Sequence, residues 1–156
     1  MNLLPLRWPI AAFTVLTRWR RRMTLGVRVA VFDEAGRVFL IRHSYVPGWY
    51  FPGGGVEKDE TMEEAMEREL LEEGGIRLEE RAELFGNYWN RIASRRDHVA
   101  FYIARRWTQA RELKLPNFEI VEAGFFSPDA LPADVTAGTR RRLEEIAGRA
   151  ERSTMW

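Results

Sequence analysis

The sequence predicts an α+β fold in which a mixed β-sheet packs against helices. Three observations support this prediction: residues 24–126 are rich in short β-branched and aromatic segments, one capped helical segment interrupts them, and an amphipathic segment closes the chain. The length of 156 residues suits one domain with a substantial core, and 46% hydrophobic with 30% charged residues is typical of a soluble globular protein. We therefore expect a domain at residues 23–156 preceded by an extension at 1–22.

The extension differs from the rest of the chain in composition. Its apolar run, residues 10–16, is followed by a cluster of arginines, and two prolines break its start. The run is far shorter than the roughly 20 residues of a membrane span, and it lacks a small-residue cleavage pattern, which argues against a signal peptide. Three arrangements stay open: packing on its own domain, packing on a partner subunit, or contact with a membrane surface through residues 1–22. We favour packing on protein.

The chain contains no cysteine. A disulfide scaffold, a thiolate zinc site and a cysteine nucleophile are therefore excluded. The absence fits a reducing compartment, so we expect a cytoplasmic protein. The formal net charge of +1 does not by itself indicate a class of binding partner.

The first strands follow the extension. Residues 25–32 are rich in β-branched side chains, residues 33–36 form a turn signal, and residues 37–41 form a second strand. Together they predict a β-hairpin.

A helix is predicted to begin at Thr61. Glu64 lies three residues further on, which is the spacing of a capping box. Gly74 and Gly75 end the helix, because glycine adopts the left-handed C-terminal cap without steric cost. The side chains expected to face the core are Ala65, Leu70 and Leu71.

The second half of the chain predicts more strands and a final helix. Residues 81–89 and 98–107 resemble a strand pair, and residues 120–126 a further strand. A helix over residues 139–150 would place one apolar face on the core, made of Leu143, Ile146 and Ala147.

An acidic cluster lies in the second half of the helix that begins at Thr61. Glu69, Glu72 and Glu73 stand at i, i+3 and i+4, so their carboxylates project from one helix face and repel one another. A hard divalent cation would reverse that cost, because Mg²⁺ takes oxygen ligands. The alternative is a solvated acidic face, which this short segment alone would favour.

The full spacing is more specific. The segment from Gly54 to Ile76 resembles the complete Nudix box. In order, it contains Gly54, five residues, Glu60, seven residues, Arg68-Glu69-Leu70, one residue, Glu72-Glu73, one residue and Gly75-Ile76. The resemblance is detailed within the box and looser over residues 24–150, and it implies a Nudix-type α/β/α sandwich with a catalytic loop-helix. One departure is Asp59, where many members have glycine; this position lies in the variable gap of the pattern.

The resemblance implies a role for each matching residue. It assigns divalent metal binding, by Mg²⁺ with Mn²⁺ as a substitute, to Glu69, Glu72 and Glu73, one of which would be the general base. Arg68 would pair with Glu60 and orient the loop against the helix. The glycine region would offer a backbone carbonyl to the metal, through Gly53 or Gly54. A further acidic ligand is expected from a later loop, where Glu119 is the candidate and Glu122 its rival.

The implied activity is hydrolysis of a phosphoanhydride bond in a nucleoside di- or triphosphate derivative, by metal-activated water. Subfamily markers are missing after the box, which indicates the broad MutT-like class. A non-catalytic nucleotide-sensing domain and an RNA 5′-pyrophosphohydrolase stay as alternatives. The net charge gives the RNA alternative little electrostatic support, so no stable nucleic-acid partner is expected. Many members of the family are dimers, which leaves a homodimer open.

Other candidates for substrate contact are weaker. The backbone of the glycine triplet, Gly53 to Gly55, could approach a phosphate closely. Arg95 could grip a phosphate, although a solvated turn is the simpler interpretation. The two histidines, His43 and His98, are interpreted as strand residues, since no metal-ligand spacing joins them. Four aromatic residues could stack on a base but are more typical of a core: Trp49, Tyr50, Tyr88 and Trp89.

Overall fold

The computed structural model describes residues 23–156. The expected extension lies outside the described residues, so its boundary and its packing stay predictions. The elements are β1 (Thr24–Val31), β2 (Val38–His43), α2 (Met62–Glu69), η1 (Leu70–Gly74), β3 (Ile76–Leu78), β4 (Glu83–Trp89), β5 (Asp97–Ala104), β6 (Trp107–Gln109), β7 (Ile120–Phe126) and α3 (Ala137–Ile146). Within residues 23–156, no helix is both long and apolar enough to cross a membrane.

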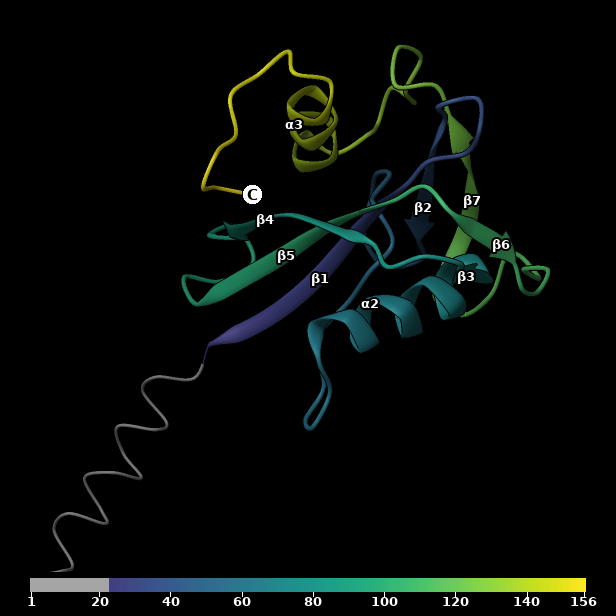
Figure 1. Cartoon of the computed structure of the whole chain (residues 1–156), viewed down its shortest axis with the longest axis horizontal. Coiled ribbons are helices and arrows are strands. Elements are labelled where there is room, and N and C mark those ends of the chain that lie inside the picture. The colour runs from purple at the N-terminus through teal and green to yellow at the C-terminus, as the bar shows by residue number, and fades with distance from the viewer. Residues whose placement is uncertain (1–22) are drawn as a thin grey trace, which may run out of the picture.

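The predicted α+β class is confirmed, with helices on both faces of a mixed sheet. The central sheet has the order β1-β5-β4, with β1 parallel and β4 antiparallel to β5. α2 and α3 lie on opposite sides of it (Figure 1). Side chains alternate along β1, as the two-residue period of a strand requires. Val27 and Val29 join the core that includes Ala65 of α2, whereas Ala30 joins the core that includes Leu143 of α3.

Two smaller antiparallel sheets complete the domain. β2 pairs with β7, and β3 pairs with β6. β7 has the bounds predicted from the sequence, and the β4–β5 pairing is also confirmed. Trp107 belongs to β6 rather than β5. β3 and β6 were not predicted, because three residues are too few to show a periodic pattern.

The predicted hairpin of the first two strands is wrong. The turn is present, with the Gly36 N–H donating to the Asp33 carbonyl at 3.0 Å, but the strands do not form a ladder: one isolated bridge joins Phe32, just after β1, to Val38 of β2. The reason is that the glycine loop occupies the free edge of β1. Val27 N–H donates to the Gly54 carbonyl at 2.8 Å, and Val29 N–H donates to the carbonyl of Pro52 at 3.1 Å. This edge pairing brings the loop into the centre of the fold.

The capping box at Thr61 is confirmed. The Thr61 hydroxyl accepts from the Glu64 N–H, and the Glu64 carboxylate accepts from the Thr61 N–H. The helix ends at Gly75, whose φ of 63° is the left-handed cap. Its last turn, η1, is π-helical, and Glu73 rather than Leu71 lies on its buried side. Ala65 and Leu70 are buried as predicted.

The C-terminal helix is earlier and shorter than predicted. The Thr136 hydroxyl caps it by accepting from the Thr139 N–H, and it ends at Ile146 rather than at residue 150. Gly148, with φ of 69°, turns the chain away from the helix axis. Leu143 is buried as predicted, but Ile146 is half-buried and Ala147 is exposed.

Candidate metal centre

Glu73 is the most buried carboxylate of the acidic cluster, with only 2% of its surface exposed. It comes from η1, and its Oε2 accepts a hydrogen bond from the backbone N–H of Gly53 at 2.7 Å. Burial raises the pKa of Glu73 to about 8, while the Gly53 bond and the nearby Arg28 guanidinium act in the opposite direction. The ionised carboxylate is therefore under-compensated by the protein groups around it.

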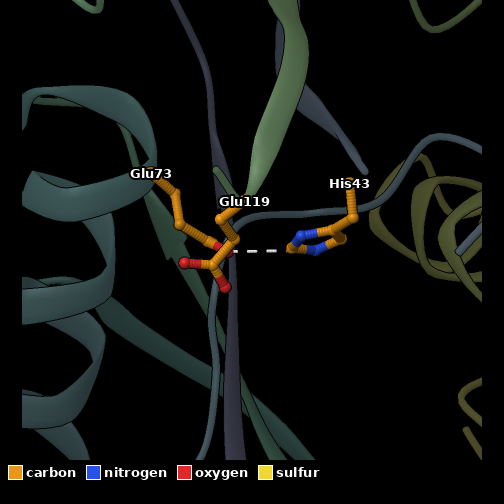
Figure 2. Close-up of side chains that lie close together, drawn as sticks. All are labelled: His43, Glu73 and Glu119. Carbon is orange, nitrogen blue, oxygen red and sulfur yellow. Dashed lines mark ion pairs between the residues drawn. The ribbon is translucent and has the colours of Figure 1, made fainter. Parts of the chain in front are cut away.

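Three potential ligands converge on this point from three separate elements (Figure 2). The donor atoms of His43, Glu73 and Glu119 all lie within 4.8 Å of one another. The His43 Nε2 is 3.8 Å from Glu73 Oε1. Burial, with a smaller contribution from Arg28, lowers the pKa of His43 to about 4, so the imidazole is neutral at neutral pH. The His43–Glu73 contact is therefore polar rather than ionic, and one ring nitrogen keeps its lone pair.

Glu69, one helical turn before Glu73, contacts the next residue of the glycine loop. Its carboxylate packs against Gly54: a Cβ built on this glycine would stand 2.1 Å from Glu69 Oε1. The same oxygen accepts from Arg68 Nη1 at 2.7 Å. Burial raises the pKa of Glu69, and the bond from Arg68 opposes that shift. Gly54 thus has no space for a side chain because a carboxylate occupies it.

Arg68 connects the helix to the loop. Its Nε and Nη2 donate to the two carboxylate oxygens of Glu60 at 2.9 and 3.1 Å, and Nη2 also donates to the Gly55 carbonyl at 3.1 Å. The pairing of Arg68 with Glu60 that the sequence implies is therefore present. The bidentate bond lowers the pKa of Glu60 and raises that of Arg68. The guanidinium fork fixes three groups at once, which suits a planar donor.

Glu72 differs from the other two box glutamates. Its side chain is 56% exposed, and its closest charged neighbour is Arg68 Nη1 at 3.6 Å. The sequence placed three equivalent carboxylates on one helix face. The structure instead buries Glu69 and Glu73 and leaves Glu72 at the surface, because the chain beyond Glu69 follows the wider π-helical turn.

The glycine loop is shaped by its contacts with β1. Gly53 has φ of 139°, and a Cβ there would stand 2.1 Å from the Val27 carbonyl, so only glycine fits. The Gly54 carbonyl, expected from the sequence as a metal ligand, already accepts the N–H of Val27 and keeps one lone pair free. At Gly55, by contrast, an added Cβ would meet no atom within 4 Å.

The two later acidic candidates are in different surroundings. Glu119 lies beside Glu73, and its Oε1 is 3.5 Å from the Tyr45 hydroxyl. Glu122 points to Arg42, with 3.5 Å between charged atoms, and is 55% exposed. Only Glu119 is brought to the cluster with His43.

Several sequence candidates lie elsewhere. Arg95 is exposed in the loop between β4 and β5, where its carbonyl accepts from the Trp89 indole N–H at 3.1 Å; this loop is at the opposite end of the sheet from η1 (Figure 1). Trp49 and Tyr88 are core residues, with 7% and 1% exposure. His98 is a residue of β5, as expected.

Two residues beside the cluster were not recognised in the sequence. His43 was interpreted as a strand residue, and it does end β2, but its side chain faces Glu73 and Glu119. Arg28 was not singled out among the arginines of the sequence. Its guanidinium shifts the pKa of His43, Glu69 and Glu73, and its Nη1 is buried with no hydrogen-bond partner among the described residues. A usable signal was an arginine inside the otherwise apolar segment of β1.

The donor set fits a divalent cation. Glu69 and Glu73 have raised pKa values because burial disfavours their charge, and a cation would offset that cost. Carboxylate oxygens are the ligands that hard cations prefer. The residues present are thus chemically suited to hold one.

Comparison with known proteins gives a consistent result. A family model described as the NUDIX domain matches residues 22–146. The crystal structure of a MutT NUDIX hydrolase from Burkholderia pseudomallei superposes with a TM-score of 0.68 at 30% identity, covering 80% of this chain and 98% of that one. An ADP-ribose pyrophosphatase from Streptococcus suis superposes with a TM-score of 0.60 at 26% identity, covering 84% and 96%.

Curated relatives match over a shorter segment. The RNA pyrophosphohydrolase of Xanthomonas campestris is 48% identical over 61 residues, which is 39% of this chain and 29% of that protein. The match therefore spans less than a third of the relative's length.

Proposed function

Because this chain belongs to the Nudix hydrolase family, we propose that it hydrolyses a phosphoanhydride bond in a nucleoside di- or triphosphate derivative with a divalent cation as cofactor. The observation that carries this proposal is the pair of buried box carboxylates, Glu69 and Glu73, which contact the adjacent loop residues Gly54 and Gly53. A solvated acidic helix would expose them.

The residues that would hold the cation are Glu69, Glu73 and Glu119, with Glu72 at the exposed side. Mg²⁺ is the proposed ion and Mn²⁺ its substitute, since the carboxylates supply oxygen ligands. When bound, such an ion neutralises phosphate charge and lowers the pKa of a coordinated water. One of the box glutamates takes the proton of the attacking water.

The protein orients this set through the loop. Gly53 holds one oxygen of Glu73, and Arg68 holds both Glu60 and Glu69. Such contacts hold the side chains in the geometry that the reaction needs. This positioning lowers the reaction barrier by more than one hydrogen bond contributes to stability. Arg68 is therefore a positioning residue.

Arg28 is the proposed phosphate-binding residue. It is half-buried on β1, and its Nη1 has a hydrogen bond left unmade by the described residues. A buried N–H donor without a hydrogen-bond partner costs free energy, so this donor is available to an acceptor that the substrate brings. A phosphate oxygen of the substrate would be that partner, through a charge-assisted bond.

Two exposed aromatic side chains flank Glu119 and provide a place for a nucleobase. Tyr45 is 65% exposed and Phe118 fully exposed. Ser44 holds the two segments together, because its N–H donates to the Glu119 carbonyl at 2.8 Å and its hydroxyl to the Phe118 carbonyl at 2.9 Å. Aromatic stacking on a base contributes about 1–3 kcal/mol.

A second candidate substrate is the 5′-triphosphate end of RNA. The local identity of 48% to RNA pyrophosphohydrolases favours it. A net charge of +1 weighs against it, since RNA affinity depends on basic surface. We therefore rank RNA below small nucleotides as the candidate substrate.

A product-resolved screen tests the proposal. Nucleoside triphosphates, nucleoside diphosphates linked to a sugar or a second nucleoside, and a 5′-triphosphorylated oligonucleotide would be incubated with Mg²⁺, with Mn²⁺ and with EDTA. We expect cation-dependent cleavage between phosphates of one small nucleotide class, with one ¹⁸O from labelled water in a phosphate product. The absence of cleavage throughout would contradict an enzymatic function.

A further inference from the structure

His43 is a buried polar side chain that the proposed function leaves unexplained. Only 6% of its surface is exposed, and its Nδ1 is buried with no hydrogen-bond partner among the described residues. Its Nε2 is 3.8 Å from Glu73 Oε1, which is longer than a hydrogen bond. A buried polar group without a partner costs free energy, so such a group points to a ligand that completes its surroundings.

The fold holds the imidazole in place. The register of the β2–β7 ladder shifts between Arg42 and His43, and irregularities of this kind re-aim a side chain. The rings of Tyr45 and Tyr50 pack on the imidazole, with centroids at 5.0 and 5.7 Å. Ser44 bonds to the Glu119 carbonyl, which fixes the end of β2 to the segment that carries the third donor.

The donor atoms lie close to the spacing of ligands on one ion. Those of His43, Glu73 and Glu119 are within 4.8 Å of one another, whereas two ligand atoms about 2.1 Å from a common ion stand roughly 3–4 Å apart, so binding one ion requires only a small inward movement of the side chains. Glu73 uses Oε2 for the Gly53 N–H, which leaves Oε1 on the side of His43. The three side chains come from β2, η1 and the segment before β7, so the topology of the fold rather than a local motif assembles them (Figure 2).

We propose that His43 is a metal ligand together with Glu73 and Glu119, so that Zn²⁺ and Mn²⁺ bind this mixed nitrogen and oxygen site more tightly than the Mg²⁺ of the proposed reaction does. Imidazole suits transition-metal ions, whereas Mg²⁺ favours oxygen donors and retains its waters. The inference rests on the proposed function in one respect, namely that Glu73 and Glu119 hold a cation.

Histidine-selective NMR tests ligation directly, because the chain has only two histidines. The ¹⁵N-labelled protein would be titrated with ZnCl₂ and, separately, with MgCl₂, and the four imidazole nitrogens followed. We expect Zn²⁺ to move one nitrogen of His43 to the shift of a metal-bound imidazole and to leave His98 unchanged. Unchanged His43 nitrogens in the presence of bound Zn²⁺ would overturn the proposal.

Calorimetry with the metals alone tests the preference. His43→Leu should weaken Zn²⁺ and Mn²⁺ binding about tenfold or more while changing Mg²⁺ affinity less than threefold. The matched control is His98→Leu, which removes the other imidazole and should change none of the three. Equal losses for all three ions in His43→Leu would show a structural role and contradict the proposal. If the variant does not fold, the wild-type spectra decide alone.

The two proposals can fail separately. Mg²⁺ binding and hydrolysis with no Zn²⁺-induced shift at His43 would remove this inference and keep the proposed function. A wild-type protein that binds none of the three ions would remove both.

Discussion

Gly54 and Glu69 are complementary: the missing side chain of the glycine is the space that the carboxylate occupies. A Cβ on Gly54 would stand 2.1 Å from Glu69 Oε1 and 2.6 Å from its carboxyl carbon. The next glycine, Gly55, has no atom within 4 Å of the same position. Substitutions at Gly54 and Gly55 therefore distinguish two reasons for glycine: space for the Glu69 carboxylate, and flexibility of the loop.

Gly54→Ala should lower kcat by about 100-fold, because the carboxylate has to leave its position and a shift of about 1 Å is enough to cost that much. Gly55→Ala, the matched control, should keep activity within about threefold. Steady-state kinetics with circular dichroism as a check on folding would measure both. Equal losses in the two variants would show that loop stiffness, rather than the Glu69 contact, matters.

Glu73→Gln should lower kcat at least ~100-fold while the domain stays folded. A neutral amide is a poor ligand for a hard dication. Its oxygen can still accept the Gly53 N–H, which preserves the buried contact. Glu67→Gln on the exposed side of α2 is the control and should match the wild type. Full activity in Glu73→Gln would remove this residue from the proposed site.

Arg68→Lys should reduce activity about tenfold or more and loosen the glycine loop without unfolding the protein. Lysine keeps the charge but cannot bond Glu60, Gly55 and Glu69 together as the planar fork does. Hydrogen exchange at residues 53–60 would report the loosening. The exposed Arg77 offers the control Arg77→Lys. Unchanged exchange in the loop would show that Arg68 does not fix it.

The parts of the fold that the sequence predicted are those set by local chemistry. The capping box at Thr61 and the glycine cap at Gly75 depend only on neighbours along the chain, and both were correctly placed. The hairpin failed because pairing depends on distant segments. β1 has two edges, and nothing in its own residues shows that β5 takes one and the glycine loop the other.

In the site, too, features set by local sequence were predicted and features set by distant contacts were not. The box spacing located Glu69, Glu73 and their partner Arg68, since all lie on one helix. It did not show that Glu72 is exposed, which follows from the π-helical turn. His43 ends strand β2, 30 residues before Glu73 along the chain, so only the fold brings the two together.

A second buried network gives a pH prediction away from the proposed site. The Tyr88 hydroxyl donates to Glu145 Oε2 at 3.0 Å, and the buried Arg142 guanidinium lies 4.0 Å from the Tyr88 ring centroid. Burial, and then the bond to Glu145, raises the pKa of Tyr88 from 10 to about 12. The folded state therefore favours the protonated phenol.

The stabilisation from Tyr88 is complete below pH 10 and is lost as the pH rises through about 12, because the folded pKa lies above the unfolded one. The free energy of unfolding should therefore fall more steeply between pH 10 and 12 in the wild type than in Tyr88→Phe. Urea titrations at several pH values would measure both slopes. Tyr45→Phe, at an exposed tyrosine, should change the slope less. Parallel slopes for Tyr88→Phe and the wild type would contradict the assignment.

Phe118 provides the test of how the substrate is recognised. Its side chain is fully exposed and directly precedes Glu119, so truncation leaves no cavity and no unpaired polar group. If a nucleobase stacks on it, Phe118→Ala should raise KM roughly tenfold and leave kcat nearly unchanged, because the contact is equal in ground and transition states. Ile92→Ala is the control, since Ile92 is 89% exposed in the β4–β5 loop, away from the cluster. A fall in kcat with unchanged KM would instead indicate that Phe118 positions Glu119, and identical kinetics would place the base elsewhere.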